Sequence, residues 1–162
     1  QLRGGVAISP PVDLAGCCDR LNQAQNWLYQ WRFLRSLQGK MIAKGDLVKQ
    51  ALGVDQLPRC RSVWEFDHRY TAPLHGFDGA EDYYRQSSSR QFLGEINYPA
   101  LLLSAGDDPL LSPGCFPGVD EVSDQVTLQY SHHGGHVSFM QRHPSGWYWA
   151  EQQCVEFLKS WA

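Results

Sequence analysis

Residues 100–109 read Ala-Leu-Leu-Leu-Ser-Ala-Gly-Asp-Asp-Pro, an apolar run that ends in a turn with two carboxylates. The run is continuous rather than alternating, which is typical of a buried strand in a parallel sheet. Open α/β sheets bind ligands on the loops that leave the carboxyl ends of their strands, so Asp107 and Asp108 are candidate functional groups. Pro109 favours an extended conformation of Asp108 and so fixes where that carboxylate points. An ordinary Asp-rich turn that caps the next element is the alternative.

Two further apolar runs predict strands. One covers residues 5–9 and has the continuous pattern of a buried strand; the other covers residues 126–131 and alternates, as a strand nearer a sheet edge does. About ninety residues separate the first two strands, which far exceeds an ordinary crossover and predicts an inserted cap or lid. The spacing of apolar residues predicts helices over residues 22–38, 41–52, 78–88 and 146–161. This order is that of an α/β domain with parallel strands.

Composition excludes several classes of protein. The chain has 162 residues, of which 43% are hydrophobic, and this excludes a disordered tail, a coiled coil and a collagen-like fibre. The 14 basic residues are dispersed and the net charge is -3, which argues against nucleic acid as a partner. No run of 18 apolar residues predicts a membrane span. Five cysteines without a Cys-x-x-Cys pair predict reduced thiols in a cytoplasmic protein.

The segment directly after the third predicted strand, residues 132–136, reads His-His-Gly-Gly-His. The paired glycines allow a tight loop that projects His136, and a carboxylate one loop away can orient such an imidazole. Metal binding by the three histidines is an alternative, as is an ordinary loop. The metal interpretation is the weaker one, because adjacent histidines tend to point apart and no His-Glu-x-x-His motif is present.

An aspartate loop followed by a histidine loop is the second half of the order Ser…Asp…His in α/β-hydrolases. The serine is missing from this pattern, since no serine upstream of Asp107 lies in a Gly-x-Ser-x-Gly elbow, and neither do Cys17 and Cys18. The first residues, which begin without methionine, already look like a core strand. We therefore expect the chain to be a piece of a longer protein.

Two stretches carry a resemblance to a known family. The first contains, in order, Asp67, Gly76-Phe77, Asp82-Tyr83-Tyr84, Ser88, Ile96, Pro99, Leu101 to Leu103 and Asp107-Asp108. This pattern resembles the signature of the YheT-like family of α/β-hydrolases, which are predicted esterases related to ABHD-type lipases. Residues 134–139 resemble the family's Gly-Gly-His-x-Gly-Phe, with Ser138 in place of the usual glycine.

The resemblance implies the C-terminal part of an α/β-hydrolase fold, with about three parallel strands, flanking helices and a helical cap insertion. We expect a core strand and loop over residues 1–12, a mainly helical cap with a return helix over residues 13–95, and the core that carries the Asp and His loops over residues 96–162. Asp67, Tyr83 and Tyr84 match the pattern without a chemical role, and we expect a loop cap and helix packing there.

By the same resemblance, Asp108 matches the family's catalytic acid and His136 its base, and Asp107 is the alternative acid. The nucleophile and the oxyanion loop are expected upstream of this chain. The implied function is a serine hydrolase of carboxylic esters, with no cofactor and no metal; a non-catalytic module or inactive homologue is the alternative. Expected partners are a small-molecule or lipid-like ester substrate and the chain's own N-terminal half, with self-association where that half is absent.

Overall fold

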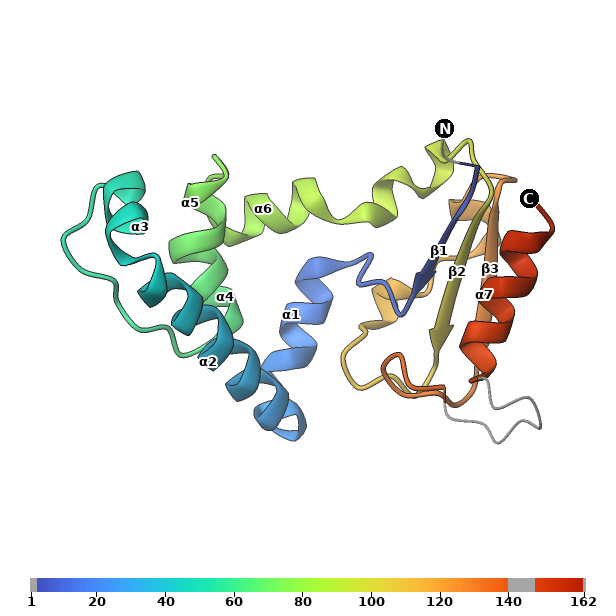
Figure 1. The fold of residues 1–162 in the computed structure, drawn as a ribbon, viewed down its shortest axis with the longest axis horizontal. Coiled ribbons are helices and arrows are strands. Elements are labelled where there is room, and N and C mark those ends of the chain that lie inside the picture. The colour runs from blue at the N-terminus through green and yellow to red at the C-terminus, as the bar shows by residue number, and fades with distance from the viewer. Residues whose placement is uncertain (1–2, 140–147, 162) are drawn as a thin grey trace. The chain divides into compact units, whose positions relative to one another are not determined.

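The computed structural model describes residues 3–139 and 148–161, which form two compact units. The sheet unit comprises residues 1–13 and 89–162, and the helical unit comprises Leu14–Ser88. Figure 1 labels the α-helices and strands of both units. No helix among the described residues is long and apolar enough to cross a membrane.

The sheet unit is built on three parallel strands in the order β1-β2-β3. They are β1 (Gly5–Ile8), β2 (Ala100–Ala105) and β3 (Val126–Ser131). The predicted α/β class and all three predicted strands are confirmed, with the first one residue shorter than predicted. Because the strands are parallel, the loops that follow β2 and β3 both emerge at the carboxyl end of the sheet (Figure 1).

The core of the sheet unit gathers on the central strand. Leu101, Leu103 and Ala105 of β2 are buried, and α7 (Trp149–Lys159) contributes Ala150 and Phe157 to the same cluster. By contrast, β1 is only half-buried along its length, so the buried strand predicted there is wrong. The physical reason is that β1 is an edge strand of this sheet, as β3 is. The helix predicted over residues 146–161 is shorter than expected, and residues 146 and 147 lie outside the described residues.

The described residues of the sheet unit also form three short 3₁₀ helices. They are η3 (Ser89–Glu95), η4 (Pro113–Cys115) and η5 (Val119–Glu121). The Arg90 guanidinium lies on η3 and forms a two-pronged contact with Glu121 on η5, with nitrogen–oxygen distances of 2.6–2.9 Å. This pair ties the segment before β2 to the segment before β3.

The helical unit contains eight elements in chain order: α1 (Leu14–Asn22), η1 (Ala24–Asn26), α2 (Trp27–Ala43), α3 (Gly45–Leu52), α4 (Val63–Phe66), η2 (Asp67–Thr71), α5 (Ala72–Leu74) and α6 (Gly79–Ser87). Its main core joins Leu34, Val48, Cys60, Phe66 and Tyr70. The predicted helix over residues 22–38 begins later and runs on to Ala43, so the helix predicted over residues 41–52 begins at Gly45. The sequence analysis did not predict α1 or the run from α4 to α5.

Asp67 lies in a helical segment, not in a loop as the expected capping role required. Its Oδ2 accepts a hydrogen bond from the Tyr84 hydroxyl at 2.7 Å, and its Oδ1 accepts one from the Thr71 hydroxyl at 2.7 Å. Burial is the main cause that raises the pKa of Tyr84, followed by its hydrogen bonds with Cys18 and Asp67. The Tyr84 bond joins η2 to α6, and the Thr71 bond lies within η2.

Candidate active site

Asp108 is held firmly in the turn that follows β2. Its backbone N–H donates to the Ala105 carbonyl at 3.1 Å, and its Oδ1 accepts from the Leu110 N–H at 2.9 Å. The second bond is an Asx-turn, in which a side chain stands in for a backbone acceptor. The side chain of Asp108 is fully buried. One carboxylate oxygen is therefore fixed by its own loop, which leaves the other for a partner.

That partner is His136. The Asp108 Oδ2 lies 2.9 Å from the His136 Nδ1, which is hydrogen-bond distance. An ionised carboxylate can only accept, so Nδ1 carries the hydrogen of this bond, and in the neutral imidazole Nε2 then carries the free electron pair. The His136 side chain is 36% exposed, and its Nε2 has no hydrogen-bond partner among the described residues. The pair thus has a buried acid end and an accessible basic end.

Asp107 contacts a different part of the same loop. Its Oδ1 accepts from the Gly135 N–H at 2.8 Å and from the Gly134 N–H at 2.9 Å, and its Oδ2 lies 3.4 Å from the His133 Nδ1. The Gly135 amide, then the Gly134 amide and His133, hold the pKa of Asp107 below its usual range. The bonds of Asp107 go to the backbone of the loop, whereas the bond to His136 belongs to Asp108.

The loop that carries His136 has an unusual backbone. Gly135, Val137 and Phe139 all have positive φ angles, of 58°, 59° and 36°. A Cβ atom on Gly134 would lie 2.5 Å from the Phe139 ring, and the Phe139 N–H donates to the Gly134 carbonyl at 2.9 Å. Phe139 is buried and lies against Trp149 of α7, with ring centroids 5.6 Å apart. Non-glycine residues with positive φ persist only where the surroundings hold them, and here the Phe139 anchor does so.

Ser9 is a part of this site that the sequence analysis did not single out. It directly follows β1, has a φ of 49° and is buried, and its Oγ accepts from the Val137 N–H at 3.4 Å. It cannot serve as a nucleophile of the elbow type, because Pro10 follows it and lacks the backbone N–H that would stabilise an oxyanion. Ser9 instead supports the backbone next to His136. The sequence does not indicate this supporting role, because a serine at the end of a strand is a common feature.

The histidines of residues 132–136 do not converge on one point. His133 faces Asp107, His136 faces Asp108, and His132 is exposed. In the part of the chain that the structure describes, no three His, Cys, Asp or Glu side chains gather closely enough to hold a metal ion.

The chain is similar to proteins that are named as esterases and phospholipases. It is 33% identical over 147 residues to "Putative esterase YheT" of Escherichia coli (strain K12), an alignment that covers 88% of this chain. It is 28% identical over 127 residues to the phospholipase ABHD3 of Mus musculus, covering 77% of this chain. It is 31% identical over 98 residues to the medium-chain fatty acid ethyl ester synthase/esterase 2 of Saccharomyces cerevisiae (strain ATCC 204508 / S288c), covering 60% of this chain.

These relatives are much longer than the chain. The alignments cover 43%, 31% and 21% of the three relatives, so the chain spans less than half the length of each. No protein-family model matches the chain, and no solved structure matches it.

Proposed function

We propose that this chain, which is homologous to part of the YheT-like α/β-hydrolases, supplies the general base and its orienting carboxylate to a serine hydrolase of carboxylic esters. The observation that carries the proposal is the 2.9 Å contact between the buried Asp108 carboxylate and His136 Nδ1. The two residues follow adjacent parallel strands, at the carboxyl end of the sheet, where α/β enzymes hold their functional groups.

In the proposed mechanism His136 Nε2 accepts the proton of a serine hydroxyl as that oxygen attacks the ester carbonyl. His136 then gives this proton to the departing alcohol, which leaves an acyl-enzyme, and water attacks the acyl-enzyme by the same steps. Asp108 holds the Nδ1–H in place and stabilises the imidazolium that forms. In this proposal the nucleophilic serine and the oxyanion donors come from a part of the protein outside this chain, because no serine of this chain lies in a Gly-x-Ser-x-Gly elbow.

We further propose that the substrate is a small-molecule or lipid-like ester, since the relatives are named as an esterase, a phospholipase and an ester synthase/esterase. The helical unit is proposed as the cap of this hydrolase. The proposal includes a cytoplasmic location, because the five cysteines are thiols and not disulfides, and it requires neither a metal nor a cofactor.

The test uses the complete protein and its His136→Ala variant, with hydrolysis of short-chain p-nitrophenyl esters as the readout. We expect turnover by the complete protein and a loss of about 10³-fold or more in the variant, since the serine then has no base. Labelling by a fluorophosphonate probe locates the nucleophile.

The 162-residue chain alone should not be labelled by the probe. Stoichiometric labelling of this chain would place the nucleophile within it and contradict the proposal. A complete protein that folds but neither turns over esters nor reacts with the probe would support the non-catalytic alternative.

A further inference from the structure

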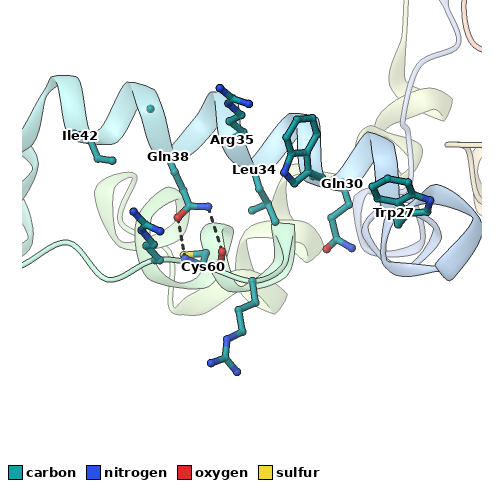
Figure 2. Close-up of a pocket in the computed structure, with 11 residues that line it drawn as sticks. Trp27, Gln30, Leu34, Arg35, Gln38, Ile42 and Cys60 are labelled. Carbon is teal, nitrogen blue, oxygen red and sulfur yellow. Dashed lines mark hydrogen bonds between the residues drawn. The ribbon is translucent and has the colours of Figure 1, made fainter.

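Each unit contains a hydrogen-bonded bridge between segments that are well separated in the sequence. In the helical unit the Gln38 side chain crosses a pocket between α2 and residues 59–61 (Figure 2). Its Nε2 donates to the Cys60 carbonyl at 3.2 Å and its Oε1 accepts from the Cys60 N–H at 3.1 Å. In the sheet unit the Ser112 hydroxyl donates to the Asp13 Oδ2 at 2.7 Å, across 99 positions of the chain. This second bridge bears on the candidate active site, because Ser112 closely follows Asp108 in the same loop.

The segment that carries Asp108, residues 106–112, is anchored at both ends. At its start the Gly106 N–H donates to the Ser131 carbonyl at 2.8 Å. Within it, the Asp108 Oδ1 accepts from the Leu110 N–H. At its end the buried Ser112 donates to Asp13. The catalytic acid of the proposed hydrolase therefore lies between an anchor on β3 and an anchor on the loop after β1.

Asp13 contacts the end of this segment with its side chain and its backbone. Besides the bond from Ser112, its N–H donates to the Cys115 sulfur at 3.4 Å, and the Cys115 thiol donates to its carbonyl at 3.9 Å. A Cβ atom on Gly114 would lie 2.2 Å from the Asp13 Oδ2, so a glycine is needed there to leave room for the carboxylate. Ser112 and Cys115 are both buried. Asp13 thus fixes the end of the segment through a closely packed set of contacts.

The loop after β1 contacts both loops of the candidate site. Its first residue, Ser9, accepts from the Val137 N–H next to His136, and its last residue, Asp13, accepts from Ser112. Two consecutive prolines and a buried valine lie between these residues. Proline rings fix the φ angle, so this connection is short and stiff. The loop after β1 therefore joins the loop that carries the acid to the loop that carries the base.

We propose that Asp13, acting through Ser112, is a positioning residue for the Asp108–His136 pair. The bond fixes the end of residues 106–112 and so keeps the Asp108 carboxylate on the His136 Nδ1. A misplacement of about 1 Å can cost about 10²-fold in rate, so a loosened segment should slow the chemistry. The effect on turnover rests on the proposed function, whereas the effect on the bond between Asp108 and His136 can be measured without turnover.

The first experiment measures ester hydrolysis by the complete protein. Ser112→Ala removes the hydroxyl donor, and we expect kcat to fall about tenfold with KM within about twofold, because positioning of the base changes and substrate binding does not. Ser123→Ala is the matched control, since it removes a serine hydroxyl that donates to the Ile96 carbonyl elsewhere in the sheet unit, and it should leave kcat within about twofold. An equal loss of kcat in Ser123→Ala would contradict the assignment.

Two variants of Asp13 test the other end of the bond. Asp13→Asn keeps an oxygen that can accept from the Ser112 hydroxyl, so kcat should stay within about threefold of the parent value. Asp13→Ala removes the acceptor and should lower kcat about tenfold, as Ser112→Ala does. Equal kcat values in the two Asp13 variants would show that this hydrogen bond is not the cause.

A double-mutant cycle tests whether Ser112 acts through Asp108. We expect Ser112→Ala to lower kcat about tenfold when residue 108 is aspartate and by less than about twofold when it is asparagine. An equal loss in both backgrounds would overturn the proposal, because Ser112 would then act by another route.

The last experiment needs no turnover. NMR of the complete protein with ¹⁵N-labelled histidine follows solvent exchange of the His136 Nδ1–H, which is assigned by comparison with His136→Ala. Ser112→Ala should accelerate this exchange about fivefold or more, because the bond from Asp108 that protects the proton is loosened. Ser123→Ala, and Gln38→Ala in the helical unit, should leave the exchange within about twofold. Unchanged exchange in Ser112→Ala would overturn the inference, whereas accelerated exchange in a protein without ester turnover would support it and contradict the proposed function alone.

Discussion

Asp107 and Asp108 are neighbours in one turn, yet their carboxylates have separate tasks. Asp108 is fully buried and meets the His136 ring, whereas Asp107 is 43% exposed and accepts from two backbone N–H groups of the same loop. One carboxylate thus contacts the imidazole, and the other holds the backbone that presents it. A change of charge at either position should therefore affect a different property of the protein.

The first prediction compares Asp108→Asn with Asp107→Asn in the complete protein. An asparagine at residue 108 keeps an acceptor for the Leu110 N–H but can present N–H groups to Nδ1, so it favours the wrong imidazole tautomer. We expect kcat to fall by about 10³–10⁴-fold in Asp108→Asn and by about tenfold or less in Asp107→Asn. Steady-state ester hydrolysis measures both. The reverse order of the two losses would make Asp107 the catalytic acid.

The second prediction concerns the pH dependence of stability. The Gly135 and Gly134 amides lower the pKa of folded Asp107, so the folded chain binds this proton less readily than the unfolded chain does. The stability that Asp107 contributes is present above its ordinary pKa and is lost as the pH falls through its lowered folded pKa. Asp107→Asn should therefore lower the thermal midpoint at pH 7 and have little effect in strong acid. An equal effect at both pH values would show that the charge is not the cause.

At the scale of elements, the strands and the loops that carry Asp108 and His136 could be predicted because their signals are local. β2 and β3 have continuous or alternating apolar residues followed directly by turn residues, and both were predicted to the residue. The start of α2 could not be predicted, because η1 tightens the chain at residues 24–26 without a proline or glycine to mark it. The run from α4 to α5 depends on Asp67, whose partner Tyr84 is 17 positions away.

The same limit applies to the site. Asp108 and His136 could be proposed from their loops, because each loop directly follows a predicted strand and the two occur in the order Asp…His. The support from Ser9 to the Val137 N–H spans 128 positions, and no local pattern indicates it. The separate tasks of Asp107 and Asp108 also depend on which side of the turn each carboxylate takes, which only the folded loop determines.

The third prediction belongs to the histidine loop as an element. Gly134 lies so close to the Phe139 ring that a methyl group there would displace the ring or the loop. We expect Gly134→Ala to destabilise the chain by about 1–3 kcal/mol, as overpacking does, and to reduce ester hydrolysis by moving His136. Denaturant unfolding and turnover measure the two effects. Gly5→Ala is the control, because a Cβ there meets no atom within 4 Å.

At the scale of the whole molecule, β1 leaves one side of the sheet without a partner strand. The Gly5 N–H donates to the Pro99 carbonyl at 2.9 Å and the Ser9 N–H to the Leu103 carbonyl at 2.7 Å. Since N–H groups alternate in direction along a strand, those of Val6 and Ile8 point to the opposite side. No strand of the described residues pairs with that side. An unpaired strand edge with apolar residues is a template for pairing with another chain.

The fourth prediction follows from this edge. The isolated chain should self-associate in a concentration-dependent way, as measured by size-exclusion chromatography with light scattering. The expected N-terminal half of the parent protein should compete with that association by pairing with β1. Val6→Pro removes the outward N–H without removing a bond between β1 and β2, and so should leave the chain more monomeric and bind the N-terminal half more weakly. Val6→Ala is the matched control, because it also loses the valine side chain from the core but keeps the N–H. Identical behaviour of the two variants would mean that self-association arises from exposed side chains, and a monodisperse parent chain with a cooperative thermal transition would show that the edge of β1 is not a pairing surface.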